Sequence, residues 1–488
     1  MTSALLTDLL CCLAVLSGLL LLGTFLRAKV KLFQQLFLPA SVIGGFIGLL
    51  FGPIVMGDHA IIRVSQDWIN TWSLLPGILI VPVFASVPLG MFMNSSGKTT
   101  GMGGKTAPNV LKAFGLFAAI GALQNMIGYG TNLFFTYFGG GKYQLYRTFG
   151  YELSAGYTGG HGTAGAVGKI LEGLGIEYWA TAQGIAVTTA TVGIIGGMII
   201  GIIAINMAAK QGKTSILKKP GDIPASMAKG YTTDISKQGS MGRETFMNSS
   251  IETTTFHLAL MLGGCGLAYA ALNLLKRTGI AAFASLPVWI YAMVIMFGIN
   301  ALLIKLKLNW MIDTKVKAKI TGAMSDFAIV AAIASLPVKA VFAYAVPLIV
   351  MMAVGMVATY VFVFKMHDVF FKGDYSFERA IICWGTATGV MITGMMLLKI
   401  CDPDYDTPAL ADFSMGFSLI SLSGLITQPI TLGVLATGST MSNFTLAAIL
   451  FLIYMVITSA AGGLSKMFSR KAEPALAGDT PSSGSSGN

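Results

Sequence analysis

Long apolar stretches recur along this chain and constrain its fold more than any other feature. A helical run of about 20 apolar residues crosses the ~30 Å hydrocarbon core of a bilayer. Within that core only helices and closed barrels satisfy their backbone hydrogen bonds, and a barrel would need short alternating strands instead of these runs. Charged residues make up 11% of the chain, less than half of the roughly 25% typical of soluble domains. The sequence therefore predicts an all-α polytopic membrane protein.

The apolar pattern predicts a series of membrane helices separated by polar loops. They are expected near 4–26, 37–56, 73–93, 109–138, 181–206, 251–275, 283–304, 318–336, 340–366, 412–436 and 443–466. Two further segments, 147–172 and 377–399, are rich in glycine and threonine, which disfavour a continuous helix. The tail after Lys471 is rich in proline, serine and glycine, which predicts disorder.

The basic residues indicate the orientation of the chain. No positive charge precedes the first apolar stretch, whereas Arg27, Lys29 and Lys31 follow it. This stretch is therefore expected to be a membrane helix with its N-terminus outside, not a cleaved signal peptide. The loops 207–248 and 305–319 are rich in lysine and are expected in the cytoplasm. The net charge of +11 thus indicates topology and contact with anionic lipid, not a nucleic-acid partner.

Three short similarities between the two halves of the chain indicate an internal duplication. They occur in the same order: LPASVIGGFIG from Leu38 and LPVWIYAMVIMFG from Leu286, FASVPLG at 84–90 and IASLPVK at 333–339, and GHGTAG at 160–165 and CWGTATG at 383–389. The first two also keep nearly equal spacing, with 49 positions from Pro39 to Pro88 and 50 from Pro287 to Pro337. If each repeat has about five crossings and one broken segment, the second copy starts from the opposite side of the membrane, so the repeats are inverted. The loop after the second helix is acidic in the first copy and lysine-rich in the second, which agrees with the inversion.

The predicted organisation follows from this duplication. The first repeat covers 1–206 and a basic cytoplasmic linker covers 207–248. The inverted repeat covers 249–436 and is followed by an extra membrane helix at 437–466 and a disordered cytoplasmic tail at 467–488. Inverted repeats with glycine-interrupted segments at corresponding positions are typical of secondary transporters, whose binding site lies between the broken segments.

The stretch SAGYTGGHGTAGAVG at 154–168 predicts the first broken segment. Each glycine in a helix interior costs up to about 1 kcal/mol relative to alanine, so a break or re-entrant hairpin is expected near Gly159–Gly160. Backbone groups freed by a break are tolerated at membrane depth only where protein or water satisfies them. The N–H groups of a helix start suit a carboxylate, and freed carbonyl groups suit a sodium ion. Close packing through small residues is the competing interpretation.

The same residues resemble a known family. SAGYTGGHGTAGAVGK is similar to the Gly-Gly-His-Gly-Thr signature of the bacterial glutamate:sodium symporters, and LPASVIGG and LQNMIGYG, at 123–130, resemble other segments of that family. The order of elements over 1–460 is also similar. The resemblance implies two inverted repeats, a scaffold that forms a homodimer, and a mobile part that carries the site across the bacterial inner membrane in an elevator-like movement.

The resemblance also implies a substrate and a coupling ion. It predicts a symporter that uses Na+ to import glutamate or a related small amino acid or carboxylate. The segment CWGTATGVMITGMM in the second half departs from the family's usual glycine- and Ala-Thr-Pro-rich pattern, which is why the substrate class is kept wider than glutamate.

The predicted substrate site lies between the tips of the two broken segments. It comprises Thr158, Gly159, Gly160, His161, Gly162, Thr163, Trp384, Gly385, Thr386 and Thr388. Three polar residues within apolar helices are predicted ion ligands: Asp326, Gln124 and Asn125.

Several of these residues have two interpretations that the sequence leaves open. His161 either contacts a substrate carboxylate or a proton, or is a satisfied interior histidine that holds the hairpin. Asp326 is either a cation ligand or proton carrier, or lies near the cytoplasmic interface, where water removes the cost of its charge. Gln124 and Asn125 either line the cavity or link two helices. Lys169 and Arg379 flank the broken segments, where they attract an anionic substrate or mark helix ends.

Other classes of function have less support in the sequence. An ion channel would need a continuous polar pore, and a proton-coupled organic-anion carrier is the remaining alternative. The four histidines are scattered and the five cysteines lack C-x-x-C spacing. Neither an enzyme nor a transition-metal site is therefore predicted.

Overall fold

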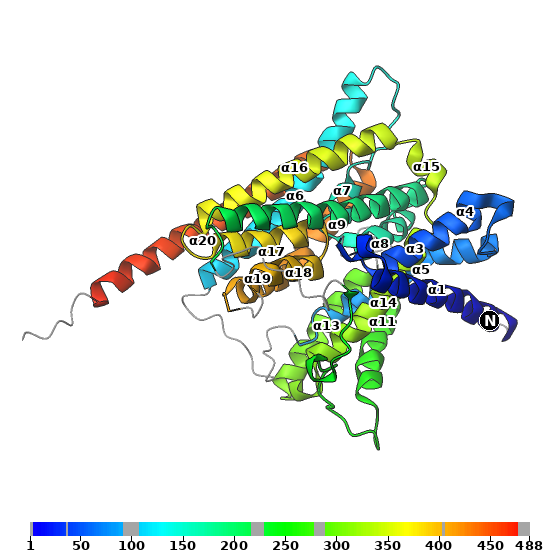
Figure 1. Ribbon diagram of the computed structural model, residues 1–488, viewed down its shortest axis with the longest axis horizontal. Helices are drawn as coiled ribbons and strands as arrows, with labels where there is room; N and C mark the ends of the chain where they lie inside the picture. The colour runs from blue at the N-terminus through cyan, green and yellow to red at the C-terminus, as the bar shows by residue number, and fades with distance from the viewer. Residues whose placement is uncertain are drawn as a thin grey trace, which may run out of the picture.

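The computed structural model describes residues 3–35, 38–90, 107–215, 229–277, 288–402 and 406–476, and within these ranges it contains helices and no strands (Figure 1). The helices of the first half are α1 (Ser3–Lys29), α2 (Lys31–Gln35), α3 (Ala40–Phe51), α4 (Pro53–Met56), α5 (Gln66–Ser86), α6 (Ala107–Phe138), α7 (Tyr151–Gly156), α8 (Gly160–Gly173) and α9 (Trp179–Lys210). Those of the second half are α11 (Thr253–Arg277), α13 (Val288–Lys305), α14 (Thr314–Ala334), α15 (Val338–Phe342), α16 (Ala345–Phe370), α17 (Ser376–Thr388), α18 (Met391–Cys401), α19 (Ala409–Thr437) and α20 (Thr440–Leu476).

Ten segments of the described residues are long and apolar enough to cross a membrane. The expectation of an all-α polytopic membrane protein is therefore confirmed. The helix expected at 318–336 is present as α14, but it is not among the ten, because Lys315, Lys317, Lys319 and Asp326 make it too polar. Its neighbours α3 and α5 cover part of its surface.

The boundaries of two helices differ clearly from the expected ones. The expected helix 37–56 divides into α3 and α4 at Gly52, because Pro53 cannot donate a backbone hydrogen bond and instead starts the next helix. The expected helix 73–93 begins earlier, at Gln66, since the hydroxyl of Ser65 accepts a hydrogen bond from the Trp68 N–H and caps α5. Residues 91–93 and 283–287 lie outside the described ranges.

The C-terminal helix is longer than expected. α20 continues to Leu476, so residues 467–476 are helical and not disordered as the composition predicts. Lysine, arginine, alanine and glutamate dominate these positions and favour a helix, whereas the serine- and glycine-rich stretch starts only later. The remainder of the predicted tail, 477–488, lies outside the described residues.

The helices pack into two groups. In the first group α6 contacts α16, α19 and α20, and α9 contacts α7, α17 and α18. In the second group α3 contacts α1 and α14, and α5 contacts α11, α13 and α14. In Figure 1 the first group lies toward the upper left and the second toward the lower right. α8 lies between them, because it contacts α9 of the first group as well as α5 and α14 of the second.

Several contacts recur between the two halves of the chain. α1 packs on α3 as α11 packs on α13, α3 contacts α14 as α13 contacts α5, and α6 contacts α7 as α16 contacts α17. This recurrence agrees with the predicted duplication; the inverted relation of the repeats and their boundaries stay predictions.

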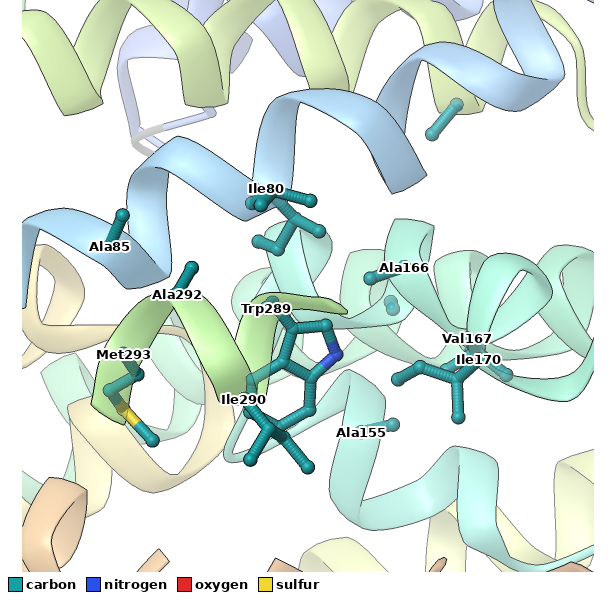
Figure 2. Close-up of a cluster of buried hydrophobic side chains, with 14 of the residues drawn as sticks. Ile80, Ala85, Ala155, Ala166, Val167, Ile170, Trp289, Ile290, Ala292 and Met293 are labelled. Atoms are coloured by element: carbon teal, nitrogen blue, oxygen red, sulfur yellow. The ribbon is translucent and has the colours of Figure 1, made fainter. Parts of the chain in front are cut away.

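A buried cluster joins α8 to the second group of helices. Figure 2 shows Ala166, Val167 and Ile170 of α8 in one cluster with Ile80 of α5 and Trp289 of α13. All five side chains are at least nine-tenths buried. In a bilayer such contacts depend on close van der Waals packing, because lipid tails are as apolar as the side chains themselves.

Candidate functional site

The chain breaks where the first glycine-rich segment predicts it. α7 ends at Gly156 and α8 begins at Gly160, so Tyr157, Thr158 and Gly159 lie between the two helices. Gly160 has a φ of +63°, a left-handed conformation that side chains other than glycine's rarely adopt. The glycine at this position therefore follows from the geometry of the turn.

The second glycine-rich segment breaks in the same way. α17 ends at Thr388 and α18 begins at Met391. The two helices fold back on each other, and a Cβ added to Gly385 would lie 2.7 Å from the Cα of Gly394. Gly385 therefore allows the two backbones of this hairpin to approach closely.

The two breaks meet. A Cβ added to Gly160 would lie 2.6 Å from the carbonyl oxygen of Gly389, and it would also contact the side chain of Val390. The tips of α7/α8 and α17/α18, which are more than 200 residues apart in the sequence, are thus in direct contact.

Gln124 of α6 binds both broken segments. Its Nε2 donates to the carbonyl oxygen of Ala387, at 2.9 Å, and to the hydroxyl of Thr359 in α16, at 3.3 Å. Its Oε1 accepts a hydrogen bond from the hydroxyl of Thr158. Gln124 is fully buried, so it links helices in this structure. The adjacent Asn125 has a buried Oδ1 without a hydrogen-bond partner among the described residues.

His161 connects the first tip to α9 and leaves one ring nitrogen unused. Its Nε2 lies 2.9 Å from the hydroxyl of Thr191, which donates its own proton to the carbonyl oxygen of Val187. The His161 Nε2 is therefore the donor, and in a neutral ring its Nδ1 carries a lone pair. That Nδ1 is buried and has no partner within the described part of the chain. His161 is thus an anchored histidine with one free acceptor.

The predicted site residues of the second tip are buried, and their polar groups bind other groups of the protein. Trp384 is fully buried, and its Nε1 donates to the carbonyl oxygen of Gly197, at 2.9 Å. The hydroxyls of Thr386 and Thr388 donate to carbonyl oxygens of their own helix. The side chain of Thr388 contacts α9 at Gly197, where no side chain intervenes.

The first tip supplies the accessible side of the junction. Thr158, Gly159, Gly162 and Thr163 are partly exposed, whereas the residues from Trp384 to Gly389 are buried. A ligand at the junction would thus contact mainly the first turn of α8.

Asp326 is not brought to the tips. It accepts a hydrogen bond of 2.9 Å from Ser41, where α14 contacts α3. α8 contacts α14 at Ala332, whose Cβ lies 3.6 Å from a Cβ added to Gly165. At 3.6 residues per turn, Asp326 lies about 120° around α14 from Ala332 and faces another direction. Its role as an ion ligand stays a prediction.

The two flanking basic residues also lie apart from the junction. Lys169 is exposed and pairs with Glu172, at 2.8 Å. Arg379 is buried and pairs with Asp412 at the start of α19, at 2.8 Å, and with Asp374, at 3.3 Å.

Comparison with known protein families identifies the chain at this point. The family model for the sodium/glutamate symporter matches residues 5–399, which includes both broken segments. The chain belongs to the sodium/glutamate symporter family. No curated protein and no solved structure matches it. Membership in this family, together with the ten apolar helices, makes the chain a multi-pass membrane transporter.

In this symporter the two broken segments hold the two ends of one helix. Arg147, just before α7, donates hydrogen bonds to the carbonyl oxygens of Leu435, Ala436 and Gly438 at the end of α19. Arg379 of α17 pairs with Asp412 in the first turn of the same helix. The sequence does not reveal this arrangement, since nothing in it indicates which distant residues these arginines contact.

Glu152 is a second residue that the sequence reasoning missed. It is fully buried in α7, where Oε1 accepts a hydrogen bond from the hydroxyl of Tyr146 and Oε2 accepts one from the N–H of Gly150, both at 2.8 Å. Glu378 occupies a similar place in α17 and is also fully buried. The repeated aromatic–Glu pair at 151–152 and 377–378 is the signal that could have drawn attention to both.

A cavity of about 360 Å³ lies between α5, α9 and the end of α14, at the contact between the two groups of helices. Its polar lining consists of Gln66, Asn70 and Ser73 of α5, Gln183 of α9 and Ser335. Gln183 donates to the carbonyl oxygen of Ser73, at 3.0 Å, and so joins the two groups at this point.

The symporter contains no cluster of three or more His, Cys, Asp or Glu side chains suited to a metal ion, within the residues that the structure describes. Its five cysteines are free.

Proposed function

We propose that this protein imports glutamate, or a closely related amino acid, with sodium ions as the driving species. The observation that carries the proposal is the contact between the two broken segments at Gly160 and Gly389, in a chain of the sodium/glutamate symporter family. Broken helices that meet within a membrane bundle are the sites at which secondary transporters bind substrate and ions.

Two helix starts supply groups for an anionic substrate. α8 and α18 both begin at the junction, and neither has a side-chain cap at Gly159 or Val390. The first N–H groups of a helix lack intrahelical partners and carry the positive end of its dipole, so they suit a carboxylate. A substrate with two carboxylates matches a junction with two such helix starts.

His161 supplies a group for the amino end of the substrate. Its free Nδ1 is an acceptor when the ring is neutral, so it matches an ammonium donor better than a carboxylate. The groups at this tip therefore favour an amino acid over a simple dicarboxylate: the two helix starts would bind carboxylates and the ring nitrogen would accept from the ammonium group.

The transport movement that we propose follows the division into two groups of helices. α6 to α9 and α16 to α20 would move with the substrate against α1, α3, α5, α11, α13 and α14, which would form the dimer scaffold. Small residues border this boundary, since a Cβ on Gly165 of α8 would lie 2.7 Å from Pro76 of α5. The proposed orientation has the N-terminus outside and the C-terminus in the cytoplasm of a bacterial inner membrane.

The test is uptake of labelled glutamate by purified protein in liposomes. We expect accumulation with an inward sodium gradient and none when choline replaces sodium. If glutamate fails, the assay is repeated with aspartate and other amino and dicarboxylic acids. Downhill flux that ignores sodium would contradict the proposal and favour the ion channel or the proton-coupled organic-anion carrier.

A further inference from the structure

The carboxyl group of Glu152 is fully buried and has no countercharge among the described residues. Gly150 contacts the backbone of Gly128, and Gly128 lies about 15 Å before the end of α6 at 1.5 Å per residue. Glu152 therefore begins its short helix well inside the bundle, and it is fully buried. It forms no ion pair with any residue in the described ranges.

Burial and hydrogen bonding act on Glu152 in opposite directions. Both oxygens accept hydrogen bonds, one from the Tyr146 hydroxyl and one from the Gly150 N–H, and these donors favour the carboxylate. Full burial disfavours the charged form. A cation beside the carboxylate would remove this penalty, and no side chain among the described residues supplies one.

A second oxygen beside Glu152 is also without a partner. Tyr129 is 2% exposed, and its hydroxyl has no hydrogen-bond partner among the described residues. Its backbone lies beside Gly150, whose N–H donates to Glu152, since a Cβ added to Gly150 would lie 2.5 Å from the Tyr129 nitrogen.

The surroundings consist of further oxygens on stacked rings. Tyr146 and Tyr178 stack with their centroids 4.4 Å apart. The buried Thr148 donates to the Tyr178 hydroxyl, at 3.3 Å. A hard cation prefers such oxygen ligands, and one carboxylate with several neutral oxygens matches a single positive charge.

The corresponding glutamate of the second half has a different environment. Both oxygens of Glu378 accept from Ser215, one from its N–H at 2.6 Å and one from its hydroxyl at 3.2 Å. The next residue, Arg379, brings a positive charge to this end of α17. The need for an external cation therefore arises at Glu152 and not at Glu378.

We propose that Glu152 and Tyr129 form a binding site for a sodium ion, separate from the junction of the two tips. The bound ion compensates the Glu152 carboxylate, and the Tyr129 hydroxyl provides a second ligand. This inference rests on the proposed sodium-driven function, because it assigns one coupling ion to a place that the substrate does not occupy.

The experiment measures sodium binding without substrate and without a gradient. Thermal unfolding of the purified protein is followed as sodium replaces choline at constant ionic strength, since a ligand of the folded state stabilises it by RT ln(1 + [L]/Kd). We expect the Tm of the unaltered protein to rise with the logarithm of the sodium concentration once that concentration exceeds Kd. Loss of even an outer-shell partner costs a metal site ~10–100-fold in affinity, so loss of the proposed ligand in Glu152→Gln should raise the fitted sodium Kd at least about tenfold.

Matched variants separate ligation from folding. Tyr129→Phe removes a hydroxyl that has no hydrogen-bond partner among the described residues, so a purely structural role predicts no change, whereas the proposal predicts a fitted sodium Kd raised several-fold. Glu172→Gln makes the same chemical change at the partly exposed Glu172 and should leave the sodium response unaltered. Glu378→Gln tests the corresponding position and should also leave it unaltered.

The possible outcomes distinguish the two proposals. A folded Glu152→Gln protein with an unaltered sodium response overturns the site, and if that variant does not fold, an unaltered response of Tyr129→Phe does so. Stabilisation by protons instead of sodium, lost in Glu152→Gln, also overturns it. Failure of sodium-driven uptake in liposomes contradicts the proposed function independently of these binding measurements.

Discussion

Glu152 and Glu378 each lie near the start of a broken segment, directly after an aromatic residue, and both are fully buried. Ser215 satisfies both oxygens of Glu378, and the neighbouring Arg379 is fixed between Asp374 and Asp412. Glu152 has hydrogen bonds but no charged partner among the described residues.

The tips of the two segments also differ, because the first is more exposed than the second. The first turns through a left-handed glycine, Gly160, and exposes part of its surface, whereas the second turns through an extended Val390 and is mostly buried. The two segments have similar sequences but differ in their contacts. The polar side chains of the second segment are satisfied by other groups of the protein, whereas the first segment keeps polar groups without partners among the described residues. We expect ligands to act on the first segment and stability to depend more on the second.

The largest expected effect is on stability, at the charged contact of the second segment. Arg379→Met leaves Asp412 buried without its partner, which should reduce the free energy of unfolding by about 3–5 kcal/mol. Thermal or denaturant unfolding in detergent measures it. Arg147→Met, at the first segment, removes hydrogen bonds to neutral carbonyl groups and should cost less, about 1–3 kcal/mol. Equal losses in the two variants would contradict the comparison, and adding Asp412→Asn to Arg379→Met should recover part of the loss.

The next effect concerns transport, at the first tip. Gly160→Ala places a side chain at a φ of +63° and against the Gly389 carbonyl, and the backbone conformation alone costs ~1–2 kcal/mol. Uptake in liposomes should fall about tenfold or more, at 1.4 kcal/mol for each factor of ten.

Two alanine variants control for this effect. Gly173→Ala, at the other end of α8, meets no atom within 4 Å and should be close to neutral. Gly389→Ala meets the side chain of Thr393, which can rotate, so it should have an intermediate effect. If Gly389→Ala impairs uptake more than Gly160→Ala, the assignment of ligand contact to the first tip is wrong.

A smaller effect is expected where one side chain binds both segments. Gln124→Leu leaves the Ala387 carbonyl and the Thr158 hydroxyl without their partner, at about 1–3 kcal/mol for an unsatisfied buried group. Thr359→Val removes only the 3.3 Å hydrogen bond, and hydrogen bonds between membrane helices average ~0.6 kcal/mol. Unfolding and uptake should both be measured. A Gln124→Leu protein with full uptake would show that the two tips do not need this link.

The smallest expected effect is on the pH dependence of stability, through the paired carboxylate of Asp313 in the loop before α14. Burial alone would raise the pKa of Asp313, but hydrogen bonds from Arg243, Lys315 and Val316 outweigh it and hold that pKa below its ordinary value. The resulting stability is present above the unfolded pKa of about 3.9 and is lost as pH falls through the lower folded value.

Arg243→Ala isolates this contribution. Arg243 is 55% exposed, so its screened contribution is about 1 kcal/mol or less. We expect the Tm of the unaltered protein to fall more steeply than that of Arg243→Ala below pH 5. Parallel curves for the two proteins would exclude the ion pair as the cause.

The sequence predicted much of the helical framework, because apolar length is a local property that each segment shows independently. The glycine-rich stretches likewise predicted both breaks, since glycine destabilises a helix wherever it occurs. The division at Gly52 was not predicted, although its cause, Pro53, directly follows it in the sequence.

Other features depend on contacts that a single sequence does not contain. The pairing of Arg379 with Asp412, and the contact of Arg147 with the end of α19, join residues far apart in the chain. Burial of Glu152 depends on the position of α6, which the glutamate itself does not indicate. Asp326 is the opposite case. Its isolated charge in an apolar helix predicted an ion ligand, but the structure places it beside Ser41, away from the tips.

α19 has one further consequence for the symporter. Its 29 residues extend about 44 Å at 1.5 Å per residue, and a different broken segment holds each end. A helix keeps the distance between its ends nearly constant, so neither segment can shift along α19 without breaking an arginine contact. A symporter loses part of its ion gradient when ions cross the membrane without substrate. Such uncoupled flux would require the two broken segments to separate. By tying both segments to one helix, Arg147 and Arg379 would limit this uncoupled leak, and variants of either should show it as sodium flux without glutamate.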